Sequence, residues 1–205
     1  QEQGKTVVVQ NPPALPLSTE ELDRSYELPY TRLAHPSYRE KIPALESVRF
    51  SLVSHRGCFG GCSFCAIGHH QGRIIQSRSA GSLVREAKRV VKMEGFSGVI
   101  QDLGGPTANM YGYTCPRWAG EGACRDRSCS LDCGSLVSGE KAHLDLLRRV
   151  REVPGVKKVF IASGIRHDLI DLTDLEYLTE ICRHHVGGHL TVAPEHIAPR
   201  VLALM

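Results

Sequence analysis

Three cysteines, Cys58, Cys62 and Cys65, lie within eight positions of one another in the stretch SHRGCFGGCSFCAIG. Thiolates at such short spacing are typical ligands of zinc or of an iron–sulfur cluster. A structural zinc ion takes four ligands, so it would need one of three nearby histidines: His55, His69 or His70. An electron-transfer [4Fe–4S] cluster also takes four cysteines, at a different spacing and with a Cys-Pro end. The third interpretation is a [4Fe–4S] cluster held by these cysteines alone, with one iron open to a small molecule.

A second group of cysteines occupies a Gly- and Cys-rich insertion. Its four members are Cys115, Cys124, Cys129 and Cys133. Their gaps match no common zinc finger, yet four thiolates on one ion or cluster could fold a segment that has few apolar residues. We hypothesise a second metal centre, either zinc or an auxiliary iron–sulfur cluster, with paired disulfides and free thiols as the alternatives. The remaining cysteine, Cys182, lies in a helical pattern and is predicted to be buried.

Composition narrows the class of protein. The 205 residues suffice for one sizeable domain or two small ones, and 41% of them are hydrophobic, which is ordinary for a globular core. The sequence contains neither an apolar run long enough to cross a membrane nor the pattern of a signal peptide. We therefore expect a cytoplasmic protein without membrane association, in which eight cysteines favour metal or redox chemistry over disulfides.

The charge distribution gives a second indication. The formal net charge is only +3, and the basic residues cluster in VREAKRVVK and LLRRVRE. Both segments are amphipathic, so we interpret their charged sides as solvated helix faces. Nucleic acid as a partner is the alternative interpretation.

The elements that would position the cysteines begin at residue 48. Residues 1–47 form a lead-in segment with one β-like run at 6–9 and six prolines, and we expect it to be otherwise irregular. Strands are predicted at 48–54, 98–103, 157–162 and 189–193, and helices at 82–93, at 140–150 and after Thr173. Glu176, three residues after Thr173, suggests a capping box. A last helix begins near residue 199.

Alternating strands and helices predict an α/β fold with a parallel sheet. Unusual residues follow each strand: HRGCFGGCSFC, GGPTANMYG, SGIRHD and PEH. Because the loops of barrel enzymes meet at the C-terminal ends of their strands, we favour a partial (β/α) barrel over a doubly wound sheet. Only about four βα units are visible, which predicts an N-terminal fragment. Its core would be incomplete at 48–205 and interrupted by the Cys-rich insertion at 106–138.

The chain resembles a known superfamily at these motifs. The CxxxCxxC spacing after a first strand, with Phe64 before the last cysteine, is similar to that of radical S-adenosylmethionine (radical SAM) proteins. The fuller runs HRGCFGGCSFCAIGHHQGR, DLGGPTANMYG, FIASGIRHDL and VAPEH resemble the YgiQ-type family of that superfamily, as does VVVQNPPALPLSTEELD in the lead-in. The resemblance covers nearly the whole chain and implies a partial barrel of the radical SAM type.

The resemblance also implies an enzyme with two cofactors. The open iron of a [4Fe–4S] cluster on Cys58, Cys62 and Cys65 would bind SAM. An electron from the reduced cluster would then cleave SAM to methionine and a 5′-deoxyadenosyl radical, which takes hydrogen from the substrate. A donor such as flavodoxin or ferredoxin would supply the electron, and the substrate is left unknown. The alternative function is a non-catalytic iron–sulfur or zinc module that binds a partner.

Glycines and an aromatic residue would shape the cluster site. We expect Gly57, Gly60 and Gly61 to allow tight turns around the cluster and to bring backbone N–H groups close to sulfur. Phe64 would shield the site beside the adenine, with an ordinary core aromatic as the alternative. His69 and His70, just past the cluster loop, are expected at the surface or behind the cluster ligands.

Candidate SAM contacts follow the later strands. Gly104 and Gly105 match a Gly-Gly-Glu motif of the superfamily, but Pro106-Thr107 stands in place of its acidic residue. Thr107 or Asp102 is therefore the candidate partner of the SAM amine, and a plain turn is the alternative role of the glycines.

The third and fourth strands supply the remaining candidates. Ser163 and Arg166 could bind the SAM carboxylate or ribose, because a guanidinium suits planar bidentate pairing. Glu195 and His196 could touch the ribose or act on the substrate. Structural salt bridges or caps are the alternative roles of these residues.

Overall fold

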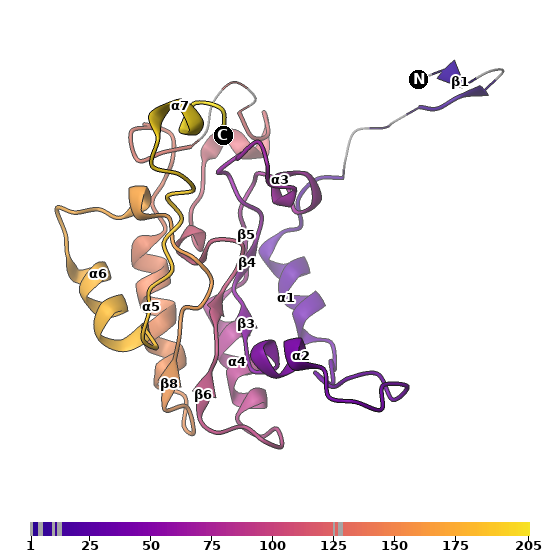
Figure 1. Ribbon diagram of the computed structural model, residues 1–205, viewed down its shortest axis with the longest axis vertical. Coiled ribbons are helices and arrows are strands. Elements are labelled where there is room, and N and C mark those ends of the chain that lie inside the picture. Colours follow the sequence, from indigo (N-terminus) through magenta and orange to yellow (C-terminus); the bar gives the residue numbers. More distant parts are fainter. Residues whose placement is uncertain (1, 4–5, 10, 12–13, 125, 127–128) are drawn as a thin grey trace.

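The computed structural model describes residues 2–3, 6–9, 11, 14–124, 126 and 129–205, which form a mixed α/β structure (Figure 1). The α-helices are α1 (Thr19–Glu27), α2 (Pro43–Val48), α3 (Ile67–His70), α4 (Ala80–Val90), α5 (Glu140–Arg151), α6 (Glu176–Glu180) and α7 (Pro199–Leu202). The strands are β1 (Glu2–Gln3), β2 (Thr6–Val7), β3 (Leu52–Val53), β4 (His55–Arg56), β5 (Gln76–Ser77), β6 (Val99–Ile100), β7 (Leu103–Gly104) and β8 (Lys158–Val159). No described helix is both long and apolar enough to cross a membrane.

Four segments of the chain lie side by side in sequence order. β3 pairs in parallel with β7, and β6 pairs in parallel with β8. A parallel bridge between Ile165 and Val192 adds the fourth segment. Because each connection advances by one neighbour, the order is sequential and does not reverse as in a doubly wound sheet. The described strands do not close into a barrel.

The core lies between these strands and the crossover helices. Leu83, Ala87 and Val90 on α4 are spaced four and three residues apart, and all three are buried. On α5, Leu144, Leu147 and Val150 are spaced three residues apart and are also buried, and both helices pack against strand residues Leu52, Ile100 and Val159 in one hydrophobic cluster. Figure 1 shows α1 and α2 on the β3–β4 side of the strands, with α5 and α6 on the β8 side.

The lead-in is more ordered than its prolines predicted. It contains α1 and α2, so the expectation of an otherwise irregular segment is wrong. A capping box opens α1: the Ser18 hydroxyl accepts a hydrogen bond from the Glu21 N–H at 3.2 Å, and the Glu21 carboxylate accepts one from the Ser18 N–H at 2.8 Å. No proline lies within α1, and Pro43 stands at the start of α2, where its missing N–H costs no hydrogen bond.

Three further expectations need correction near the C-terminal end. Thr173 does not open a capping box, because its N–H and hydroxyl both bond the Asp171 carboxylate and α6 begins at Glu176 without a side-chain cap. The strand expected at 189–193 is reduced to the single bridge at Val192. Cys182 is exposed rather than buried, since the π-helical turn Ile181–His185 directs its first and last residues into the core instead.

Candidate functional site

The first three cysteines lie on a loop between β4 and β5, which pair antiparallel. The loop leaves β4 at Gly57, whose φ of +89° is a conformation that favours glycine. A Cβ at Gly57 would lie 2.1 Å from the Ile74 carbonyl oxygen, so no other residue fits without moving the backbone. The Cys58 N–H then donates to the Gly72 carbonyl at 3.0 Å, which closes the base of the loop.

Cys58, Cys62 and Cys65 line one cavity of about 520 Å³. The loop passes close to two of the thiols at Gly60: a Cβ there would lie 3.4 Å from Cys58 Sγ and 3.7 Å from Cys62 Sγ. In the described part of the chain, no three His, Cys, Asp or Glu side chains are arranged to hold a single metal ion. The three thiols and Gly60 thus contribute to the wall of one cavity.

The other walls of the cavity come from residues that follow the later strands. Thr107 follows β7, Arg166 follows β8, and Glu195 follows the bridge at Val192; all three line the cavity. Phe64 lines it as well and is 59% exposed, so it is not a buried core aromatic. The structure thus brings together seven of the candidate residues: Cys58, Cys62, Cys65, Phe64, Thr107, Arg166 and Glu195.

Arg166 is held in place from two directions. Its guanidinium pairs with the Asp168 carboxylate, and Nη1 lies 3.6 Å from the Cβ position of Gly60, beside the thiols. Burial disfavours the charge of Arg166, but Asp168 outweighs it and raises the Arg166 pKa. Asn109, which the sequence did not single out, bonds both the N–H and the carbonyl of Arg166. Nothing in its context, an apolar run after the GGPT turn, signals that role.

Negative groups gather around Cys62. Burial raises the pKa of the Cys62 thiol, and the Glu195 carboxylate and the Cys58 thiol raise it further. Glu195 has a φ of +59°, in the left-handed region that non-glycine residues rarely occupy. Such backbone strain is concentrated at ligand sites. A positively charged group among these side chains would relieve their repulsion.

The other candidates do not line the cavity. Ser163 donates its hydroxyl to Asp102 at 2.6 Å, and the Ala162 and Ser163 N–H groups donate to the same carboxylate, so Asp102 caps the turn after β8. A Cβ at Gly104 would lie 2.0 Å from Ser163 Oγ, and one at Gly105 would lie 2.6 Å from the His55 ring. Close packing explains these glycines and Ser163. His196 is exposed outside the cavity, as are His69 and His70.

Comparison with known proteins identifies similar sequences. A family model described as radical SAM N-terminal matches residues 1–51. Similar UPF0313 proteins come from Methanosarcina acetivorans, 56% identical over 98% of this chain, and from Methanocella arvoryzae and Clostridium botulinum, 55% and 49% identical over all of it. The chain belongs to the radical SAM superfamily. It covers 27% of the Methanosarcina acetivorans relative and about a third, 34% and 33%, of the other two.

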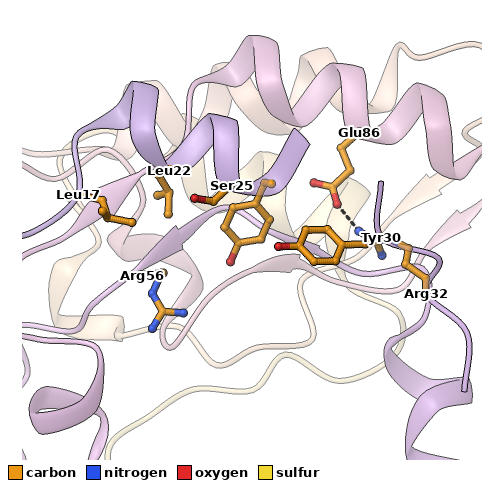
Figure 2. Close-up of a pocket in the computed structure, with 8 residues that line it drawn as sticks. Leu17, Leu22, Ser25, Tyr30, Arg32, Arg56 and Glu86 are labelled. Atoms are coloured by element: carbon orange, nitrogen blue, oxygen red, sulfur yellow. Dashed lines mark hydrogen bonds and ion pairs between the residues drawn. The ribbon is translucent and has the colours of Figure 1, made fainter. Parts of the chain in front are cut away.

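The N-terminal segment of this radical SAM chain docks on α4 around a second cavity (Figure 2). That cavity, of about 600 Å³, lies beside Leu17, Leu22 and Ser25 and contains no thiol among its lining residues. Arg32 of the lead-in pairs with Glu86 of α4, as Figure 2 shows. Glu86 also pairs with the fully buried Arg78, whose guanidinium lies 4.2 Å from the centre of the Tyr26 ring. These contacts hold the lead-in to the core and offer no metal ligands.

The four later cysteines also gather in one place. Cys115, Cys124, Cys129 and Cys133 line a third cavity, of about 300 Å³. All eight cysteines of the chain are free thiols in the structure. The insertion therefore contains no disulfide, one of the alternatives that its sequence left open.

Proposed function

We propose that the full-length protein is a radical SAM enzyme. Its [4Fe–4S] cluster would be bound by Cys58, Cys62 and Cys65, and SAM would lie in the adjoining cavity. The observation that carries the proposal is the shared cavity: three thiols line the same space as Thr107, Arg166 and Glu195, which come from three other segments. The parallel strands in sequential order support a partial barrel of the radical SAM type, with the site at the C-terminal ends of its strands.

The thiol side of the cavity fits an iron–sulfur cluster. A four-iron cube holds its thiolates farther apart than a single ion does, and Cys58, Cys62 and Cys65 line one cavity of about 520 Å³. Gly60 leaves free the space that a side chain would fill beside Cys58 and Cys62. A zinc site completed by His55, His69 or His70 has less support, because the His55 ring is buried against Gly105 and the other two are exposed and do not line the cavity.

The remaining walls fit SAM. Arg166 offers a guanidinium for the carboxylate, and Asn109 and Asp168 fix its backbone and side chain. Glu195 and Thr107 offer oxygen atoms for the amine or the ribose hydroxyls, and the exposed face of Phe64 offers a surface on which a purine can stack. Thr107 rather than Asp102 is the candidate for the position of the missing acidic residue, because Asp102 already accepts three hydrogen bonds.

When bound, the cluster and SAM would supply reductive cleavage of the S–C5′ bond, giving methionine and a 5′-deoxyadenosyl radical. The chain's own contribution would be to bind the carboxylate at Arg166, to orient the adenosine against Phe64 and to exclude water. A cytoplasmic electron donor of the flavodoxin or ferredoxin class would be needed. The substrate-binding residues would lie largely in the part of the protein outside this chain.

Cluster loading and SAM binding test the proposal. Anaerobically reconstituted full-length protein should show an electron paramagnetic resonance (EPR) signal after reduction, and added SAM should shift that signal. Cys62→Ala should lose the SAM-sensitive signal, because two thiolates cannot hold the cube well. Cys182→Ala, at an exposed cysteine outside both groups, should retain it. A SAM-sensitive signal in Cys62→Ala would overturn the assignment.

A further inference from the structure

The Cys-rich insertion gathers its four thiols around one cavity. Cys115 directly precedes the 3-10 helix Pro116–Ala119, and Cys124, Cys129 and Cys133 follow that helix. The cavity walls also include Trp118, Leu136 and Asp132.

The described part of the insertion has little else to hold it in shape. Between Thr114 and Val137, which form one antiparallel bridge, the described residues contain a single turn of 3-10 helix. Trp118, Cys129 and Leu136 pack on a small hydrophobic cluster, whereas Leu131 is 43% exposed. A small segment of this kind is ordinarily stabilised by disulfides or a metal, and these thiols form no disulfide.

Zinc and a four-iron cluster hold four thiolates differently. Zinc bound by four cysteines would draw the sulfurs onto one point at about 2.3 Å each. The quartet lines a cavity of about 300 Å³, as the first cysteine group lines one of about 520 Å³. We propose that Cys115, Cys124, Cys129 and Cys133 bind an auxiliary [4Fe–4S] cluster.

The proposed cluster would be a close neighbour of the first. Cys58 and Cys129 contact the same small hydrophobic cluster, which includes Phe59 and Tyr113. The Phe59 ring centre lies 6.4 Å from that of Trp118, which lines the quartet's cavity. Phe59 and Trp118 thus connect the surroundings of the two thiol groups.

Arg73 connects the two groups electrostatically. Its Nη1 donates to the Cys124 carbonyl at 2.6 Å, and Nη2 lies 3.4 Å from the Cβ position of Gly61 in the first loop. Its charge acts to lower the pKa of Cys129, against the effect of the other thiols. A cluster on four thiolates carries net negative charge, which this guanidinium would offset.

Metal content and EPR spectra test the proposal on full-length protein, purified without oxygen with iron, sulfide and zinc supplied. The Cys58, Cys62 and Cys65 triple-Ala variant removes the first site, so it should retain about four irons and four sulfides per chain and an EPR signal after reduction that SAM does not change. Further replacement of Cys124 and Cys129 by Ala should abolish both. Cys182→Ala should leave the metal content at that of the wild type, about eight irons per chain.

The iron content of the wild-type protein tests the proposal even if the variant with all five cysteines replaced does not fold. About four irons in wild-type protein, with a single EPR signal, would overturn the auxiliary cluster. A triple-Ala variant that holds stoichiometric zinc, or that is free of metal, would overturn it too. The proposed radical SAM function would survive these outcomes, since it depends on the first cysteine group alone.

Discussion

Asn109 and Arg166 are joined by two hydrogen bonds, with the Arg166 N–H donating to Asn109 Oδ1 at 2.9 Å and Asn109 Nδ2 donating to the Arg166 carbonyl at 2.8 Å. Asn109 is 1% exposed, so both bonds are shielded from water. Two bonds to the backbone of one residue fix where its side chain begins. Asn109 is therefore a positioning residue for the guanidinium that faces the thiols.

Replacing Asn109 by Ala should weaken SAM binding without removing the first cluster. We expect the affinity for SAM to fall about tenfold, the equivalent of one lost hydrogen bond to a well-placed partner, while the iron content stays that of the wild type. Asn109→Asp keeps the acceptor and loses the donor, so its affinity for SAM should lie between that of the wild type and that of Asn109→Ala. Calorimetric titration of the reconstituted proteins with SAM measures the affinity of both variants. Unchanged SAM affinity in Asn109→Ala would contradict the role of Asn109 as a positioning residue for Arg166.

Gly57 and Gly72 form a matched pair for testing the cluster loop. Their φ angles are nearly equal, +89° and +88°, but a Cβ at Gly57 meets the Ile74 carbonyl, whereas one at Gly72 meets nothing within 4 Å. Gly72→Ala should therefore lower the free energy of unfolding by only about 1 kcal/mol, the strain of an alanine at this φ. The variant should retain the iron of the first site. Ala at Gly57 should lose most of that iron. Equal iron content at the first site in the two variants would show that the clash does not matter.

Glu86 should be critical to the docking of the lead-in. It is the charged partner of Arg78, which is buried completely, so Glu86→Ala would leave an unpaired charge in the core. We expect a loss of about 3–5 kcal/mol in the free energy of unfolding. The control is Glu27→Gln at the exposed Arg85–Glu27 pair between α4 and α1, which should cost less than about 1 kcal/mol. Denaturant unfolding measures both, and similar costs would contradict the ranking.

Buried histidines should make the protein less stable in mild acid. Burial lowers the pKa of His55 to about 4 and that of His143 to about 3, from an ordinary 6.5. Below about pH 6.5 the unfolded chain binds protons that the folded chain excludes, so the free energy of unfolding falls as the pH falls. Each histidine contributes about 1 kcal/mol per pH unit in this window.

His143→Gln isolates this effect, because glutamine can still bond the Tyr177 hydroxyl but does not titrate. The slope of unfolding free energy against pH, between about pH 6 and about pH 4.5, should become shallower than in the wild type. His184→Gln, at an exposed histidine, should leave the slope unchanged. A wild-type slope in His143→Gln would show that this imidazole does not stay neutral in the fold.

The sequence predicted which residues share the cavity of the candidate site better than it predicted the elements around them. Spacing identified the thiols, and the βα alternation placed Thr107, Arg166 and Glu195 after successive strands, because parallel strands end at one edge. The two hydrogen bonds between Asn109 and Arg166, and the hydrogen bond from Ser163 to Asp102, join segments some 60 residues apart. No local sequence pattern encodes such contacts. The lead-in helix α1 had a local signal, the Ser18–Glu21 capping box, which the surrounding prolines obscured.

Cleavage of SAM tests the central claim most directly. Full-length protein, reconstituted anaerobically and reduced with dithionite, should convert SAM to 5′-deoxyadenosine and methionine, and Cys62→Ala should not. Chromatographic quantification of 5′-deoxyadenosine measures this turnover. A cluster that is stably bound at Cys58, Cys62 and Cys65 without any cleavage of SAM would contradict the account and favour a non-catalytic iron–sulfur module.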